Sequence, residues 1–181
     1  RWQQLSGAVM AKGHEDTASY RYPALLAQAE VGSDPGDGAS DAVERFHRRV
    51  APHRGLVTTT THDTKRSEDV RCRIAVLSER ADAFEVGLAR WRGRVRPSEG
   101  VTPAEQRFVA QTLLGAWPLT PDGFEEFGSR ISAYLTKAMR EAKQQTSWLA
   151  PDEAHEAEVI ALAERSIAGH GRRFRDVFGE L

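Results

Sequence analysis

The chain has 181 residues, of which 40% are hydrophobic and 28% charged, and its formal net charge is -1. A chain of this length and composition can bury a core of its own, which argues against a disordered protein. The near-neutral charge gives no long-range attraction for nucleic acid or an anionic membrane, and no apolar run approaches the ~20 residues of a spanning helix, so we expect neither partner.

The first part of the sequence predicts short helices separated by loops. Residues 1–22 hold an apolar run that is broken at Gly13, which predicts an irregular polar turn before a helix interrupted near Pro23. The stretch VGSDPGDGASD, residues 31–41, concentrates turn-forming residues and predicts a loop. Residues 41–50, DAVERFHRRV, predict a short helix.

One strand is predicted, over residues 56–61. It contains four consecutive threonines, whose β-branched side chains favour an extended backbone. A single strand cannot satisfy its own backbone hydrogen bonds. We therefore expect this strand to belong to a sheet or barrel whose other strands lie outside this chain.

After Ser67 the pattern is helical. Apolar residues recur at intervals of three and four and share one predicted face: Val70, Ile74, Leu77, Ala81, Phe84, Leu88, Trp91 and Val95. Further boundaries are marked, in chain order, by a T-P-x-E capping box at 102–105, by Thr120-Pro121, by Pro151 and by a glycine break at 169–171 before a short terminal helix. The sequence therefore predicts a mainly α chain.

The run THDTKR joins the predicted strand to the first of these helices. In one interpretation, Asp63 or Thr64 caps the helix and His62 is a polar residue at a strand end. In the other, His62 and Asp63 are site residues, because parallel barrels carry out catalysis at the carboxyl ends of their strands. An imidazole and a carboxylate there can hold sugar hydroxyls and stabilise a developing positive charge. Lys65 and Arg66 are either solvated cations or site residues, because they lie near a helix start, where the macrodipole disfavours cations and invites a functional reason.

No metal or cofactor is expected. The six histidines are far apart, and there is no Cys-x-x-Cys pair and no glycine-rich phosphate loop. The single cysteine, Cys72, cannot form an internal disulfide and reads as a packing residue. With no signal peptide in the sequence, this predicts a cytoplasmic protein. Because the chain begins at Arg1 within an ordered segment, we expect it to be part of a longer protein.

Four segments, in order along the chain, resemble a known family. GAVMAKGHEDTASYRY, THDTKRSEDVRCRIAVLSE, QTLLGAWPL and KAMREAKQQTSW are similar to segments of the maltooligosyl trehalose synthases, which are members of the α-amylase superfamily. The resemblance runs over nearly the whole chain. It implies a (β/α)8-barrel enzyme that rearranges the reducing-end α-1,4 linkage of a maltooligosaccharide into an α,α-1,1 linkage, by intramolecular transglycosylation.

The resemblance also implies roles for individual residues. Asp63 corresponds to the third carboxylate of the superfamily, which stabilises the transition state, and His62 hydrogen-bonds the same sugar. Lys12 and Lys65 line the site of the reducing-end glucose. The full substrate-binding set expected is Lys12, Lys65, Arg66, Asp16 and Tyr20. The segments that carry the nucleophile and the acid/base in this superfamily are absent, so we expect the chain to be inactive on its own.

Two parts are expected. Residues 1–66 are barrel-derived active-site segments, with 56–61 as one late barrel strand, and residues 67–181 form an α-helical subdomain that covers the reducing-end side of the cleft. The expected partners are a maltooligosaccharide and the remainder of the catalytic barrel. Two alternatives stay open: a different α-amylase-superfamily enzyme, and a non-catalytic helical interaction module whose apolar faces dock a partner protein.

Overall fold

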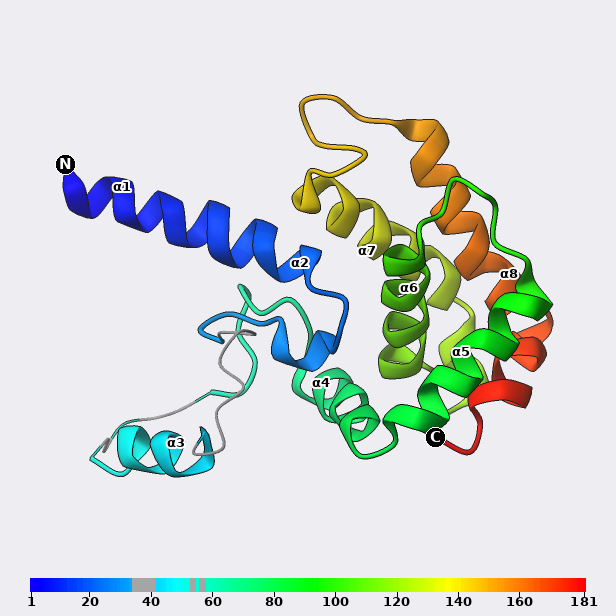
Figure 1. The fold of residues 1–181 in the computed structure, drawn as a ribbon, viewed down its shortest axis with the longest axis horizontal. Coiled ribbons are helices and arrows are strands. Elements are labelled where there is room, and N and C mark those ends of the chain that lie inside the picture. Colours follow the sequence, from blue (N-terminus) through cyan, green and yellow to red (C-terminus); the bar gives the residue numbers. More distant parts are fainter. Residues whose placement is uncertain (34–41, 53–54, 56–57) are drawn as a thin grey trace.

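The computed structural model describes residues 1–33, 42–52, 55 and 58–181 (Figure 1). Every regular element within these ranges is helical, which confirms the mainly α class and leaves no strand among the described residues. The elements are α1 (Trp2–Ala8), the π-helical segment η1 (Val9–Ala18), α2 (Ser19–Arg21), the 3-10 turn η2 (Leu26–Gln28), α3 (Ala42–Val50), α4 (Glu68–Ala75), the 3-10 turn η3 (Val76–Ser78), α5 (Ala81–Val95), α6 (Pro103–Ala116), the 3-10 turn η4 (Pro121–Phe124), α7 (Phe127–Ala142) and α8 (Glu153–Phe178).

The N-terminal segment is a helical rod that extends from the rest of the molecule (Figure 1). The prediction of an irregular turn around Gly13 is therefore wrong, because α1, η1 and α2 follow one another without a break. Local side-chain bonds stabilise the π-helical segment η1 around Gly13. Lys12 and Asp16 form an ion pair of 2.6 Å, and the Thr17 hydroxyl donates to the Lys12 carbonyl oxygen at 2.7 Å. These bonds offset the cost of a glycine within a helix.

The strand predicted over 56–61 is not confirmed. Residues 56–57 lie outside the described residues, and residues 58–61 are irregular. Threonine hydroxyls in this segment bond locally: Thr58 Oγ1 donates to the Thr60 carbonyl oxygen at 2.8 Å, and Thr59 Oγ1 donates to Glu68 at 2.6 Å. No neighbouring strand is described that could pair with this backbone, which is what a strand requires.

The helical face predicted from residue 70 to residue 95 is divided between two helices. A turn at residues 79–80 separates η3 from α5, yet Ile74, Leu88 and Trp91 are all buried. The apolar spacing thus identified most of the buried face but not the break, and Ala81, which was expected on that face, is exposed. Cys72 is exposed on α4, so its expected packing role is wrong.

The start of α6 confirms the predicted capping box. Thr102 accepts from the Glu105 backbone N–H, and the Glu105 carboxylate accepts from the Thr102 N–H at 2.8 Å. The start predicted at Pro121 is a 3-10 turn instead, and the α-helix begins at Phe127. The predicted glycine break lies within α8, where Gly169 and Gly171 take φ values of 63° and 68°.

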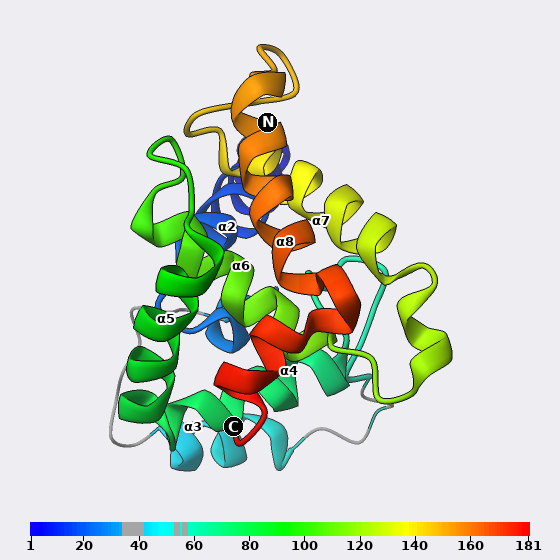
Figure 2. The same cartoon turned by 90° about the vertical axis from the view of Figure 1, so that its right-hand side faces the viewer.

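The core lies where α8 packs against α5, α6 and α7, and α4 packs against α6 (Figures 1 and 2). Aromatic rings fill the core next to the C-terminal half of α8: Trp117 stacks on Phe174 with ring centroids 4.9 Å apart, and the ring centroids of Phe174 and Phe178 are 4.7 Å apart. The largest fully buried side chains include Trp91, Phe127, Phe174, Leu26, Ile74, Leu88, Leu113 and Leu135. No helix in the part of the chain described here is long and apolar enough to cross a membrane.

Candidate functional site

The run from Thr61 to Arg66 forms a turn that leads into α4. The Thr64 N–H and the Thr64 hydroxyl both donate to the Thr61 carbonyl oxygen, at 3.2 and 2.7 Å, and the Asp63 N–H donates to the Thr61 hydroxyl at 3.2 Å. This turn leaves His62 and Asp63 exposed, with His62 Nε2 and an Asp63 carboxylate oxygen 3.4 Å apart. The two residues singled out in the sequence are therefore adjacent and open to a ligand.

Asp16 joins two lysines from distant parts of the sequence. Its Oδ2 lies 2.6 Å from Lys12 Nζ, and its Oδ1 lies 2.6 Å from Lys65 Nζ, 49 residues further along the chain. The Lys12 side chain is 73% exposed, whereas that of Lys65 is 8% exposed. Each ammonium carries three N–H donors, so donors remain on both lysines after the bond to Asp16.

Electrostatics favour the charged forms of this group. Partial burial works to raise the pKa of Asp16, but the hydrogen bonds and charges of Lys12 and Lys65 outweigh it and lower that pKa below its ordinary value. The hydrogen bond to Asp16 raises the pKa of Lys12, and the charges of Asp16, Glu141 and Asp63 add to this effect. The charge of Asp63 is thus part of the electrostatic environment of Lys12.

Glu30 fixes the backbone at the end of the same turn through hydrogen bonds. It is buried, and its carboxylate accepts from three backbone N–H groups, those of Val31 at 2.9 Å, Lys65 at 2.6 Å and Arg66 at 3.0 Å. The Arg66 guanidinium is also buried and donates through Nη1 to the carbonyl oxygens of Leu26 and Ala29. These bonds tie residues 26–31 to the start of α4.

Tyr20 and its neighbour connect the N-terminal rod to α7. The Tyr20 ring lies beneath Lys65, with 5.8 Å from Nζ to the ring centroid, and burial raises the pKa of its hydroxyl. Arg21 donates to the carbonyl oxygens of Ala142 and Lys143 at the end of α7. Lys12 and Asp16 are therefore held in place by contacts that reach 122 residues along the chain.

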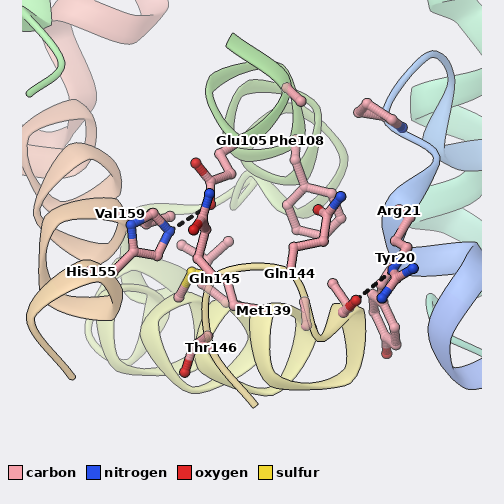
Figure 3. Close-up of a pocket in the computed structure, with 15 residues that line it drawn as sticks. Tyr20, Arg21, Glu105, Phe108, Met139, Gln144, Gln145, Thr146, His155 and Val159 are labelled. Atoms are coloured by element: carbon pink, nitrogen blue, oxygen red, sulfur yellow. Dashed lines mark hydrogen bonds and ion pairs between the residues drawn. The ribbon is translucent and has the colours of Figure 1, made fainter. Parts of the chain in front are cut away.

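A small pocket lies behind Tyr20, between α2, α6, α7 and the start of α8 (Figure 3). Tyr20 and Arg21 are on one side of it, and His155 is on the other, 2.6 Å from a Glu105 carboxylate oxygen. Its volume of about 50 Å³ gives room for a few water molecules rather than a sugar. None of Lys12, His62 and Asp63 lines this pocket, which we interpret as structural packing.

The structure thus brings Lys12, Asp16 and Lys65 into direct contact, with Tyr20 under Lys65 and Arg66 buried beside it. Their binding of a substrate remains a prediction. No three His, Cys, Asp or Glu side chains gather into a metal-ligand set within the described ranges. The sequence reasoning missed three supporting residues: Glu30, Arg21 and Gln111, whose amide bonds the backbone of Leu26 and Pro23. An acid between apolar residues, as in AQAEV, is the signal that could have indicated Glu30.

Comparison with known proteins places these features in a wider context. No protein-family model matches the chain. A protein of Mycobacterium tuberculosis named as a maltooligosyl trehalose synthase is 38% identical over 168 residues, an alignment that covers 88% of this chain and 21% of that protein. The chain thus spans about one fifth of the length of the curated relatives it matches.

Solved structures agree with this match. A maltooligosyl trehalose synthase structure from Sulfolobus tokodaii superposes with a TM-score of 0.86 at 32% identity, over 99% of this chain and 25% of that one. The Arthrobacter ramosus maltooligosyltrehalose synthase gives a TM-score of 0.81 at 34% identity, over 99% of this chain and 23% of that one. The resemblance found in the sequence is therefore confirmed: the chain is homologous to a segment of the maltooligosyl trehalose synthases.

Proposed function

We propose that this chain is part of a cytoplasmic isomerase of trehalose biosynthesis that converts the reducing-end α-1,4 linkage of a maltooligosaccharide into an α,α-1,1 linkage. The observation that carries the proposal is the Asp16 carboxylate, which holds Lys12 and Lys65 on its two oxygens next to the exposed His62–Asp63 pair. The relatives' names supply the substrate class. The longer polypeptide supplies the nucleophile and the acid/base.

Asp63 takes the role of transition-state stabiliser in this proposal. The reaction passes through a sugar ring that gains positive charge, and hydrogen bonds to its hydroxyls strengthen as the ring flattens. Asp63 is exposed on a turn fixed by Thr61 and Thr64, so its position is set before the sugar binds. His62 donates to, or accepts from, a hydroxyl of the same sugar.

Lys12 binds the reducing-end glucose through its free N–H donors. This glucose must turn over between bond cleavage and bond formation, and donors on a flexible exposed side chain can follow its hydroxyls. Lys65, Arg66, Asp16 and Tyr20 were all expected to bind the substrate. The burial of Lys65 and Arg66 favours a supporting role, in which they hold Lys12 and Asp63 in place.

The rest of the barrel covers the N-terminal rod and the threonine segment. Trp2, Leu5 and Val9 are spaced by three and four residues on the rod and are exposed, so they present an apolar stripe to a partner. In the proposal, residues 56–61 pair with other strands as a late strand of the (β/α)8 barrel. The proposal divides the chain after residue 66, between the barrel segments and the helical subdomain. The helices from residue 67 onward cover the reducing-end side of the cleft and exclude water from it, which favours rearrangement over hydrolysis.

The two alternative functions explain fewer of the structural observations. A helical interaction module explains the exposed stripe of Trp2, Leu5 and Val9 but gives no reason for the Asp16 bridge or the exposed His62–Asp63 pair. A different α-amylase-superfamily enzyme, such as a hydrolase, would use the same Asp63. The reaction products separate a hydrolase from an isomerase.

The test uses the longer polypeptide and an Asp63→Asn variant, with maltopentaose as substrate. We expect kcat to fall by roughly 10²–10³-fold, because one preorganised transition-state partner is lost. Asp122→Asn is the matched control, since Asp122 is exposed on η4, and it should leave kcat unchanged. Unchanged kcat in Asp63→Asn would remove Asp63 from the mechanism. Trehalosyl product formed by the 181-residue chain alone would refute the assignment of the nucleophile to another part of the polypeptide.

A further inference from the structure

A second pocket, of about 380 Å³, opens where the start of α4 meets α6 and α7. Three cationic residues line it, Lys65, Arg66 and Arg130, and no carboxylate residue is among its described lining. Its remaining walls are largely apolar and include Phe127 and Ile131. The pocket is therefore lined by both cationic and hydrophobic side chains.

Arg66 presents an unpaired edge in this pocket. Its side chain is 6% exposed, and Nη1 donates to the carbonyl oxygens of Leu26 and Ala29. Nε and Nη2 are buried and have no hydrogen-bond partner in the described part of the chain. These two atoms form the edge of a guanidinium that binds both oxygens of a carboxylate or phosphate. A buried guanidinium edge left without a partner is costly.

Two hydroxyls in the same pocket are also unpaired. Thr112 is 5% exposed, and both its Oγ1 and the Tyr134 hydroxyl are buried with no partner in ordinary hydrogen-bond geometry among the described residues. The Arg66 guanidinium lies over the Tyr134 ring, 6.0 Å from its centroid, and interacts with that hydroxyl outside this geometry. Unsatisfied buried polar groups are rare in folded proteins and ask for an explanation. One pocket thus holds donors from three different segments, those of Arg66, Thr112 and Tyr134. This arrangement indicates a ligand that accepts several hydrogen bonds.

The charges around the pocket favour an anion. Asp16 shares its one negative charge between Lys12 and Lys65, each at 2.6 Å, and the buried Glu30 carboxylate, which accepts from the Lys65 and Arg66 N–H groups, offsets part of the charge of Arg66. Arg66 and Arg130 have no ion pair with any residue that the structure describes, which leaves a local excess of positive charge. Neutral sugar hydroxyls would leave this charge uncompensated.

We propose that this pocket binds a small organic oxyanion, a carboxylate or a phosphate with an apolar part. Its oxygens pair with the Nε–Nη2 edge of Arg66 and accept from the hydroxyls of Thr112 and Tyr134. Its apolar part lies against Phe127 and Ile131. The proposal does not depend on the proposed function, because its ligand is an anion and Thr112, Tyr134 and Arg130 lie outside the expected sugar-binding set, with which the pocket shares only Lys65 and Arg66.

Calorimetric titration of the longer polypeptide with inorganic phosphate and with benzoate tests the proposal. We expect saturable binding of at least one anion, and an increase of at least about tenfold in its dissociation constant in Arg66→Lys, which loses the bidentate edge. Arg94→Met, which removes an exposed cation paired with Asp176, is the control and should leave the dissociation constant unchanged. Absence of binding by both anions overturns the proposal.

Two further variants keep the test independent of folding defects, since Arg66 also supports the backbone. Tyr134→Phe and Thr112→Val preserve shape and each remove one hydroxyl that is unpaired without ligand. We expect the melting temperature without anion to stay equal or rise, because an unsatisfied buried group is removed. The increase in melting temperature caused by the anion should shrink in both variants. An anion-induced increase that matches the unmodified protein in both variants overturns the proposed site.

Discussion

Replacement of Glu30 by glutamine tests whether this carboxylate holds the Lys65–Arg66 turn. The charged carboxylate accepts from the backbone N–H groups of Lys65 and Val31 through Oε1 and from that of Arg66 through Oε2. A glutamine keeps one acceptor oxygen and places an NH₂ group where the second oxygen was. The variant therefore loses the bond to the Arg66 N–H and leaves this buried donor opposite another donor.

The cost follows from these bonds. A hydrogen bond to a charged group contributes about 1.5–3 kcal/mol, and a buried donor left unsatisfied costs about 1–3 kcal/mol, so we expect a loss of about 3–5 kcal/mol in the free energy of unfolding. In a chain of this size each kcal/mol lowers the melting temperature by about 2–4 °C, which gives a decrease of roughly 6–20 °C. The assay is urea unfolding followed by circular dichroism, supported by calorimetry.

Glu79→Gln is the matched control, because Glu79 is exposed and undergoes the same change in charge. Its free energy of unfolding should change by less than about 0.5 kcal/mol. A Glu30→Gln variant that loses less than about 1 kcal/mol would show that the three bonds do not determine the stability of the turn. The reasoning about how Lys65 and Arg66 are positioned would then be wrong.

Two other predictions concern α8. The bidentate hydrogen bond from Arg140 lowers the pKa of Glu156, so this pair stabilises the fold above the ordinary glutamate pKa and is lost as the pH falls through the lowered value. Glu156→Gln should lower the free energy of unfolding by about 2–3 kcal/mol at pH 7. Below the lowered pKa of Glu156 the variant and the unmodified protein should be equally stable, as measured by urea unfolding at several pH values. Gly171→Ala places a methyl group at positive φ against the Trp117 ring and should lower the free energy of unfolding by about 2–5 kcal/mol. In the same assay Gly13→Ala, whose added methyl group meets no atom within 4 Å, should raise it by up to about 1 kcal/mol. A difference between wild type and Glu156→Gln that is independent of pH, or equal effects of the two glycine substitutions, would contradict these assignments.

Features encoded over a few residues were predictable from the sequence. The capping box at Thr102 and Glu105 depends on residues three apart, and the structure confirms it. The apolar spacing around Trp91 identified the buried face of α5 for the same reason. The turn at residues 79–80 has no strong local signal, because buried apolar residues continue on both sides of it, from Ile74 and Leu77 to Phe84 and Leu88.

Long-range partners were not predictable. Asp16 meets Lys65 across 49 residues, and Glu30 meets Arg66 across 36, and nothing in a single sequence specifies such pairs. The prediction of an irregular turn at Gly13 was wrong because glycine often breaks helices, whereas here the ion pair of Lys12 and Asp16 stabilises the helical turn around it. A strand depends on partners elsewhere, so propensity alone could not confirm residues 58–61 as one.

The proposed function is the rearrangement of the reducing end of a maltooligosaccharide by the longer polypeptide. Proton NMR of a reaction with maltopentaose tests it most directly, because the anomeric protons of reducing ends and of an α,α-1,1 linkage can be followed together. We expect the reducing-end signals to disappear as an α,α-1,1 signal appears in equal amount, with little free glucose. Accumulation of shorter saccharides that still carry reducing ends, without the α,α-1,1 signal, would contradict it and indicate a hydrolase.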